Sequence, residues 1–158
     1  MGESVRGLDG ELEVLAANHV LEYPYSRSVG PVLSRFFTAL RVGRIEGVRA
    51  ASGMVIVPPT EYDPVSAART GEPVEVSDAG SVTTWTWVAA PAPTQPLDRP
   101  FAFALIHLDG AETALLHAVA AGDEARMSTG MRVRAQWRDE RVGHINDIVC
   151  FVPEGAGP

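Results

Sequence analysis

The hydrophobic and polar positions of this chain predict one helix near the N-terminus, where apolar residues recur at the spacing of a single helical face. Pro31 suits the first turn of a helix, where its missing N–H costs nothing, and Gly43 suits a C-terminal cap. The apolar stripe between them comprises Val32, Leu33, Phe36, Phe37 and Leu40.

The segment after this helix favours two short strands, at residues 45–50 and 54–57. The turn dipeptide Ser52-Gly53 separates them, and Pro58-Pro59 ends the unit. Residues 60–72 contain Asp63-Pro64 and Thr70-Gly71 and are expected to form a loop. The pattern therefore predicts a small β unit next to the helix.

From residue 73 onward the pattern is dominated by strands. The proline-rich connector at residues 91–100 is excluded from a sheet interior, and residues 122–127 indicate a single helical turn. Strands are expected at residues 81–90, 101–108, 113–119, 132–137 and 145–152. Five strands with a helical insert between the third and the fourth are the order of an OB-fold, a small Greek-key barrel. The alternative is a fragment of a generic β-sandwich.

We therefore predict a mainly β protein in four parts. Residues 1–28 are an N-terminal extension, and residues 29–72 hold the helix and the small β unit. Residues 73–153 form the barrel, and residues 154–158 are a tail. At 158 residues the chain suits one domain with a structured extension, and it is long enough to bury an ordinary core.

The composition excludes several classes of chemistry. Acidic residues outnumber basic ones 20 to 13, and this net charge of −7 argues against a nucleic-acid partner. All the basic residues are arginines, so neither a Schiff-base lysine nor a P-loop lysine is present. No apolar stretch reaches the roughly 18 residues of a membrane span. The N-terminus lacks the pattern of a signal peptide, so we expect a cytoplasmic protein with no membrane partner.

Few side chains suggest a catalytic or metal site. His107 and His117 lie on two paired strands and can approach each other, but no further ligand converges on them. Cys150, the single cysteine, excludes disulfides within the chain and sits in an apolar run, so we expect an inert thiol. His144 and Asp147 are three residues apart on one expected strand and thus on opposite faces. We expect no catalytic residue and no metal ion.

One charge pattern departs from the acidic average. Residues 27–49 hold five arginines against the single carboxylate of Glu46, a net charge of +4. The arginines are Arg27, Arg35, Arg41, Arg44 and Arg49. Two interpretations stay open: the solvated face of an amphipathic helix, or a docking patch for an anionic ligand or an acidic partner. Similarly, Trp85 and Trp87 are either barrel core or a stacking platform.

Three stretches between residues 30 and 153 form a distinctive combination. They are Val57-Pro58-Pro59 with Tyr62 and Pro64, the stretch DRPFAFALIHLDGAETALLHAV, and GMRVRAQW followed by VGHINDIVCFVPE. Together with the order of helix, small β unit and barrel, they resemble the acyl-CoA-associated OB-fold family, also called domain of unknown function thirty-five. The resemblance implies the same architecture.

Many members of that family carry a rubredoxin-like zinc ribbon with two cysteine pairs between helix and barrel. The first pair corresponds here to positions near Ala50 and Ser52-Gly53, and the second to Asp63 and Ser66. None of these residues is a cysteine. Because thiolates hold structural zinc, the resemblance implies a degenerate, metal-free ribbon held by packing.

The resemblance also implies a function. Family members stand beside thiolase-fold proteins, including lipid-transfer-protein-like aldolases that cleave the side chain of a steroid-CoA thioester by a retro-aldol reaction. The segment Glu61-Tyr62-Asp63-Pro64 is similar to members linked to steroid degradation. The chain would then be a non-catalytic accessory subunit in a heterotetramer, with the CoA thioester as the substrate of the complex and no cofactor of its own.

Two alternatives stay open beside this interpretation. The chain can be an acyl-CoA-binding or channelling scaffold module for a thiolase or synthase without aldolase chemistry, or an independent enzyme acting on CoA esters. Under the first two hypotheses, the candidates for contact with a partner or with CoA are Arg35, Phe36, Phe37, Arg41, Arg44 and Arg49.

Overall fold

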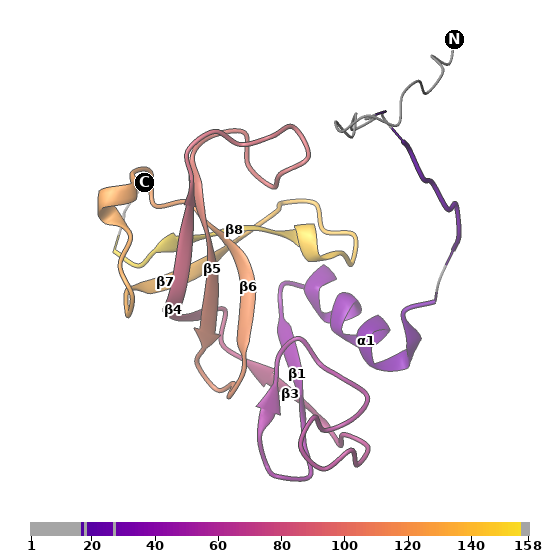
Figure 1. Cartoon of the computed structure of the whole chain (residues 1–158). Coiled ribbons are helices and arrows are strands. Elements are labelled where there is room, and N and C mark those ends of the chain that lie inside the picture. Colours follow the sequence, from indigo (N-terminus) through magenta and orange to yellow (C-terminus); the bar gives the residue numbers. More distant parts are fainter. Residues whose placement is uncertain (1–16, 18, 27, 156–158) are drawn as a thin grey trace, which may run out of the picture.

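The computed structural model describes residues 17, 19–26 and 28–155 of the chain. In this part of the chain there are one α-helix, eight β-strands and two short 3-10 helices. Figure 1 shows a β-barrel with the helix and a small sheet beside it. Of the helices in the described ranges, none combines the length and the apolar character that a bilayer crossing requires.

The barrel is closed by five strands, and the prediction of an OB-fold is confirmed. Their spatial order is β4-β5-β6-β8-β7, with β7 pairing back onto β4. The 3-10 helix η1 (Glu124–Arg126) lies between β6 and β7, at the predicted place of the helical insert. The barrel strands are β4 (Ala79–Val88), β5 (Phe101–Leu108), β6 (Ala114–Val119), β7 (Arg132–Trp137) and β8 (Ile148–Pro153).

The barrel core follows from the alternation of side chains along each strand. On β5 the small residues Ala102 and Ala104 point inward and pair with Trp87 and Trp85 on β4. Both indoles are partly buried and pack against the main core, so the barrel-core interpretation of this pair is confirmed. Small residues opposite large ones let the interior of a narrow barrel fill without voids.

A three-stranded antiparallel sheet and the helix lie next to the barrel. The helix α1 (Gly30–Arg41) precedes β1 (Ile45–Arg49), which lies between β2 (Val55–Ile56) and β3 (Pro73–Val76). The strand β3 belongs to the segment that the sequence places with the barrel, but it pairs with β1. The helix and both expected strands of the small β unit are thus present within a residue or two of their predicted bounds.

Hydrogen bonds join the small sheet to the hairpin between β5 and β6. The Val55 N–H donates to Glu112 Oε2 at 2.5 Å, and the Glu112 N–H donates to the Val55 carbonyl at 2.9 Å. The Val57 N–H donates to Thr113 Oγ1 at 2.7 Å, and the Thr113 hydroxyl donates to the Val57 carbonyl at 2.8 Å. Backbone groups at the edge of β2 therefore have partners on the barrel, which holds the small sheet in one position.

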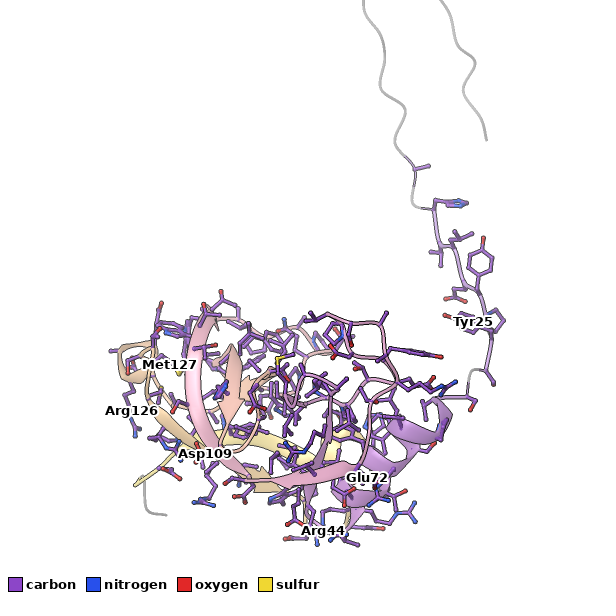
Figure 2. All side chains as sticks on the ribbon, turned by 90° about the horizontal axis from the view of Figure 1, so that it is seen from below. Tyr25, Arg44, Glu72, Asp109, Arg126 and Met127 are labelled. Atoms are coloured by element: carbon purple, nitrogen blue, oxygen red, sulfur yellow. The ribbon has the colours of Figure 1, made fainter. Side chains whose placement is uncertain are left out.

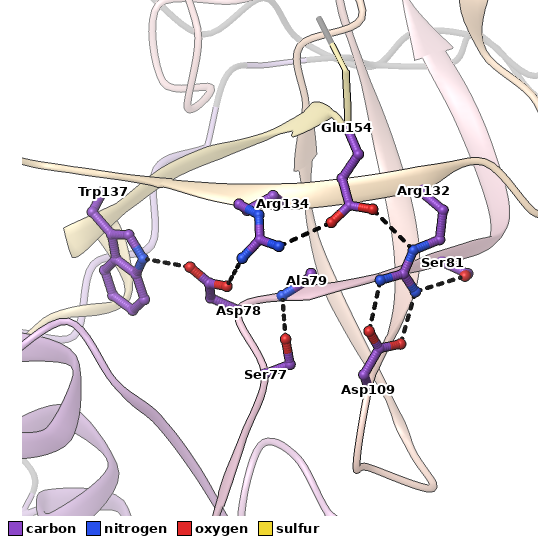
Figure 3. A network of polar contacts seen from close by, with 9 residues as sticks. All are labelled: Ser77, Asp78, Ala79, Ser81, Asp109, Arg132, Arg134, Trp137 and Glu154. Carbon is purple, nitrogen blue, oxygen red and sulfur yellow. Dashed lines mark hydrogen bonds and ion pairs between the residues drawn. The ribbon is translucent and has the colours of Figure 1, made fainter. Parts of the chain in front are cut away.

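Ion pairs cover the seam where β7 meets β4 and β8 (Figure 3). Arg132 pairs with Asp109 at 2.6 Å and with Glu154 at 3.2 Å, while Arg134 pairs with Asp78 at 2.5 Å and with Glu154 at 3.1 Å. The hydrogen bonds from Arg132 hold the pKa of the Asp109 carboxyl below its usual value. Three carboxylates thus neutralise two arginines, and this surface offers no excess positive charge to an anionic ligand.

Candidate functional site

The apolar stripe of α1 serves the core of this chain. Phe36 is 2% exposed and Leu40 is fully buried, and both belong to the cluster that fills the barrel. Phe37 is half-buried and stacks on the His144 ring, with 6.3 Å between the ring centroids. Of the two phenylalanines predicted as contacts with a partner or with CoA, Phe36 is therefore buried in the core of this chain, while Phe37 keeps an accessible edge.

Two of the candidate arginines meet at one carboxylate. Arg35 Nε lies 2.9 Å from Glu46 Oε2, and Arg44 Nη2 lies 3.7 Å from Glu46 Oε1. Arg44 also reaches Glu75 at 3.5 Å. The Glu46 side chain is only 11% exposed, whereas those of Arg35 and Arg44 are 62% and 50% exposed. A shallow hollow of about 470 Å³ beside α1 has Arg35, Arg44 and Glu46 in its lining. The sequence showed Glu46 as the one carboxylate of the segment but not its position between two arginines.

The other candidate arginines bind backbone carbonyls. Arg41 donates to the Val142 carbonyl from Nε at 3.2 Å and from Nη2 at 3.0 Å. Arg49 donates to the Gly53 carbonyl at 3.0 Å. Arg27 lies outside the described residues. The predicted patch is therefore divided: Arg35 and Arg44 share one surface, while Arg41 and Arg49 hold loops in place.

Asp63 is the one carboxylate among the positions that correspond to the family's cysteine pairs. Its side chain is buried, with the residue 1% exposed, and its two oxygens accept bonds from the Val65 N–H at 2.8 Å and the Ser66 hydroxyl at 2.9 Å. The bond from Val65 is the main cause that holds the pKa of Asp63 below its usual value, against the effect of burial. The backbone N–H groups of Ser66 and Ser52 lower this pKa further.

These residues do not suit a zinc ion. The positions of the two family cysteine pairs hold one carboxylate, hydroxyls and apolar groups, and both carboxylate oxygens already accept hydrogen bonds, from Val65 and Ser66. In the part of the chain that the structure describes, no group of three histidine, cysteine or carboxylate side chains converges as metal ligands do. The Asp63 carboxylate instead holds its own turn, through the Val65 N–H and the Ser66 hydroxyl.

His107 and His117, which the sequence allowed to approach each other across the β5–β6 hairpin, do not meet. His107 pairs with Ala114 and His117 with Ala104, so the two histidines are three residue pairs apart and on opposite faces. His117 is partly buried and lies edge-on to Phe151, with 5.5 Å between the ring centroids. Burial lowers the pKa of His117, as expected for an imidazole in an apolar environment. The possible approach is not realised because strand register, which the sequence spacing does not fix, decides which side chains meet.

His144 and Asp147 are not on a strand, contrary to expectation. His144 is the N-cap of the 3-10 helix η2 (Ile145–Asp147), Asp147 is its last residue, and β8 begins only after it. Asp147 is 1% exposed and accepts backbone N–H bonds from Val142 at 3.0 Å, Gly143 at 2.7 Å and His144 at 3.1 Å. Burial alone would raise the pKa of Asp147, but these three bonds outweigh it and the pKa is lowered. The carboxylate is thus a loop clamp and not a general base.

The prediction for Cys150 is confirmed. Its side chain is fully buried, and burial raises the pKa of the thiol. The thiol contacts Gln136 Oε1 at 3.3 Å. A protonated and inaccessible thiol is unsuited to nucleophilic attack.

A groove of about 470 Å³ lies on the outer side of β5 and β6, between the connector at residues 91–100 and the loop at residues 138–147. Its lining includes Gln95, Phe103, Leu116, His117, Arg138 and Asn146. Leu116 is 60% exposed and pairs with Leu105, which is 37% exposed. OB-folds bind their ligands on this face. The only trace of this groove in the sequence was the presence of apolar residues at outward positions of β5 and β6. Periodicity alone could not tell these residues from core residues.

Three comparisons place these features among known proteins. Residues 73–138 match the family model described as the C-terminal OB-fold domain of ChsH2. No curated protein sequence matches the chain. The crystal structure of a DUF35-family protein of unknown function from Sulfolobus solfataricus is 24% identical, covers 69% of this chain and 80% of its own, and has a TM-score of 0.55. A chain of the Ltp2-ChsH2(DUF35) aldolase is 20% identical, covers 81% of this chain and 95% of its own, and has a TM-score of 0.58.

Proposed function

We propose, on the premise that this chain is an OB-fold protein of the DUF35/ChsH2 type, that it is a non-catalytic accessory subunit of an aldolase complex. Its partner is a thiolase-fold, lipid-transfer-protein-like subunit, and the complex is a heterotetramer. The reaction is the retro-aldol cleavage of the side chain of a steroid-CoA thioester.

The observation that carries this proposal is the match of residues 73–138 to the C-terminal OB-fold domain of ChsH2. The likeness in fold to a chain of the Ltp2-ChsH2(DUF35) aldolase extends over most of both chains and supports it. The substrate and the reaction come from the resemblance to the family.

The chemistry of the described residues supports an accessory role. A retro-aldol step needs a base and an acid placed at the bond that breaks. The buried carboxylates of Asp63 and Asp147 accept backbone N–H groups, and the His117 ring accepts the Ala118 N–H at Nδ1. In the proposed complex the acid–base groups come from the partner, and this chain contributes a rigid surface.

The exposed arginines beside α1 are our candidates for contact with the partner or with a CoA phosphate. The side chains of Arg35 and Arg44 are 62% and 50% exposed although both pair with the Glu46 carboxylate. Their remaining N–H groups therefore face solvent. Phe37 adds an accessible apolar edge on the same helix, and Arg41 and Arg49 hold the neighbouring loops. An arginine fork matches the geometry of carboxylate and phosphate alike.

Co-expression with the Ltp2-type protein from the same genome tests the proposal. We expect a stable complex that cleaves a steroid-CoA thioester, and loss of this activity when the chain is omitted. Replacement of Arg35 and Arg44 by glutamine should slow association, because charges at an interface rim act mainly on the association rate. Arg126→Gln, at an exposed arginine of η1, is the matched control. Turnover by the isolated chain, or the absence of any complex, would refute the proposal.

The groove on β5 and β6 favours a second candidate function, an acyl-CoA-binding or channelling module. The groove combines an apolar wall at Phe103 and Leu116 with the cation of Arg138. Calorimetric titration of the isolated chain with an acyl-CoA distinguishes the two. Saturable binding that Arg138→Ala weakens supports this module, and the absence of heat at millimolar acyl-CoA rejects it.

A further inference from the structure

Residues 19–26 form an extended arm that leaves the folded body at the start of α1 (Figure 1). Four of its side chains are large, apolar and mostly exposed: Val20 is 77% exposed, Leu21 65%, Tyr23 71% and Tyr25 79%. In the described part of the chain, none of them belongs to a buried cluster. Figure 2 shows Tyr25 on the arm, away from the body. Such a concentration of exposed apolar surface marks an interaction site.

The base of the arm has a defined direction. Gly30 adopts a φ of 75°, a conformation that favours glycine, and a Cβ there would lie 2.8 Å from Glu61 Oε1. The Gly30 N–H donates to the Ser28 hydroxyl at 3.3 Å, and Pro31 follows as the second residue of the helix with φ restricted by its ring. The turn into α1 is thus built by residue type, and it directs the arm away from the barrel.

The order of residues in the arm suits insertion into a groove. Leu21, Tyr23 and Tyr25 occupy every second position, so in an extended chain their side chains lie on one side. Pro24 stands between the tyrosines, keeps the segment extended and removes one backbone donor. Tyrosine brings a large apolar ring with a hydroxyl at its tip, which is favoured at interfaces. The arm therefore has the character of an extended recognition segment.

The charge of the region selects the kind of partner. Residues 1–28 contain five carboxylate side chains and two arginines, a net charge of −3. A groove that accepts the arm is therefore apolar at its floor and positive at its rim. A hollow of the chain itself between α1 and β1, lined by Pro31 at the start of the helix, has a volume of about 220 Å³. That is below the roughly 300–1,000 Å³ of an ordinary ligand pocket, so it is too small for three such side chains.

We propose that Leu21, Tyr23 and Tyr25 dock together into one apolar, positively rimmed groove on the catalytic subunit of the aldolase complex. This inference rests on the proposed function and adds to it a specific contact segment. The arm would then contact the catalytic subunit at a place separate from the surface formed by Arg35 and Arg44 beside α1, and beyond the folded body of this chain.

The test compares the full chain with a variant carrying Leu21→Ser, Tyr23→Ser and Tyr25→Ser. Binding to the purified Ltp2-type protein is measured by biolayer interferometry, and thermal unfolding is followed by circular dichroism. We expect the variant to lose affinity by about tenfold or more, because aromatic anchors carry much of the binding energy at interfaces. Its unfolding temperature should equal that of the wild type. Val20→Ser, on the opposite side of the arm, and Val65→Ser, on the body and 78% exposed, are controls and should bind as the wild type does.

The other outcomes each contradict the inference in a different way. Equal affinity of wild type and triple variant removes the arm from the interface while leaving the proposed function intact. A wild type that does not bind overturns the proposed function and the docking contact with it. A lower unfolding temperature of the triple variant means that the arm packs on its own body. Concentration-dependent self-association that the variant abolishes means that the groove belongs to a second copy of this chain.

Discussion

Replacement of Asp147 by asparagine isolates the contribution of one buried carboxylate to the attachment of α1. Asn has nearly the same volume but only one acceptor oxygen. If that oxygen keeps the bonds from Gly143 and His144, the amide NH₂ then faces the Val142 N–H, which loses its acceptor. A buried backbone donor without a partner costs about 1–3 kcal/mol. We therefore expect Asp147→Asn to lower the free energy of unfolding by about 2 kcal/mol, or roughly 4–8 °C in Tm for a chain of this size.

The effect should be concentrated at the helix. The loop that Asp147 clamps accepts Arg41 at the Val142 carbonyl, and Arg141 donates back to the Arg41 carbonyl at 3.3 Å. His144 of the same loop stacks on Phe37. Hydrogen exchange in Asp147→Asn should therefore accelerate for the amides of α1 more than for those of β5, because the helix loses its support on this side.

Urea unfolding followed by circular dichroism measures the stability, and Asp139→Asn, at an exposed carboxylate of the same loop, is the control. Because the folded pKa of Asp147 is lowered, its contribution is fully present above the unfolded pKa of about 3.9 and is lost as the pH falls through the folded value. The difference between wild type and variant should therefore shrink only in acid. A variant within about 0.5 kcal/mol of the wild type at neutral pH would refute the clamp.

Three further predictions concern the core and the ribbon. Phe36→Ala should lower the free energy of unfolding by about 3–5 kcal/mol in urea titrations, because the ring is buried in the main core cluster. Phe37→Ala should lower it much less, and equal losses in the two variants would contradict the difference in burial. Asp63→Ala should lower the urea midpoint more than Ser66→Ala, since it removes the acceptor of both the Val65 N–H and the Ser66 hydroxyl. Added zinc should change neither midpoint, and a shift with zinc would contradict the expectation of a metal-free segment. Cys150 should react with a thiol reagent only at the rate of unfolding, and rapid modification of the native chain would show that its site opens.

The candidate site was only partly visible in the sequence. The arginines could be named, but their partners could not, because Arg35 meets Glu46 through the packing of a helix on a strand. Arg41 binds the Val142 carbonyl, which is 101 residues away in the chain. For the arm, by contrast, the apolar residues lie close together in the sequence and are easily found. Their exposure becomes evident only in the structure, where the core of the folded body forms without them.

Local pattern was sufficient for the elements themselves. The apolar stripe of α1, the alternation along the barrel strands and the turn at Asp109-Gly110 are properties of neighbouring residues, so they can be recognised from the sequence. The order of five strands and one helical turn then leaves few topologies other than the barrel.

Tertiary structure alone decided which faces meet. It paired β3 with β1, separated His107 from His117 by three positions of register, and converted residues 145–147 from an expected strand into a clamped turn. It also buried Phe36 in the core. The physical reason is that register and loop closure depend on the sum of many long-range contacts, each too weak to leave a mark on the local sequence. Helices and strands are set by near neighbours, whereas the surface available to a partner is what remains after all of them have packed.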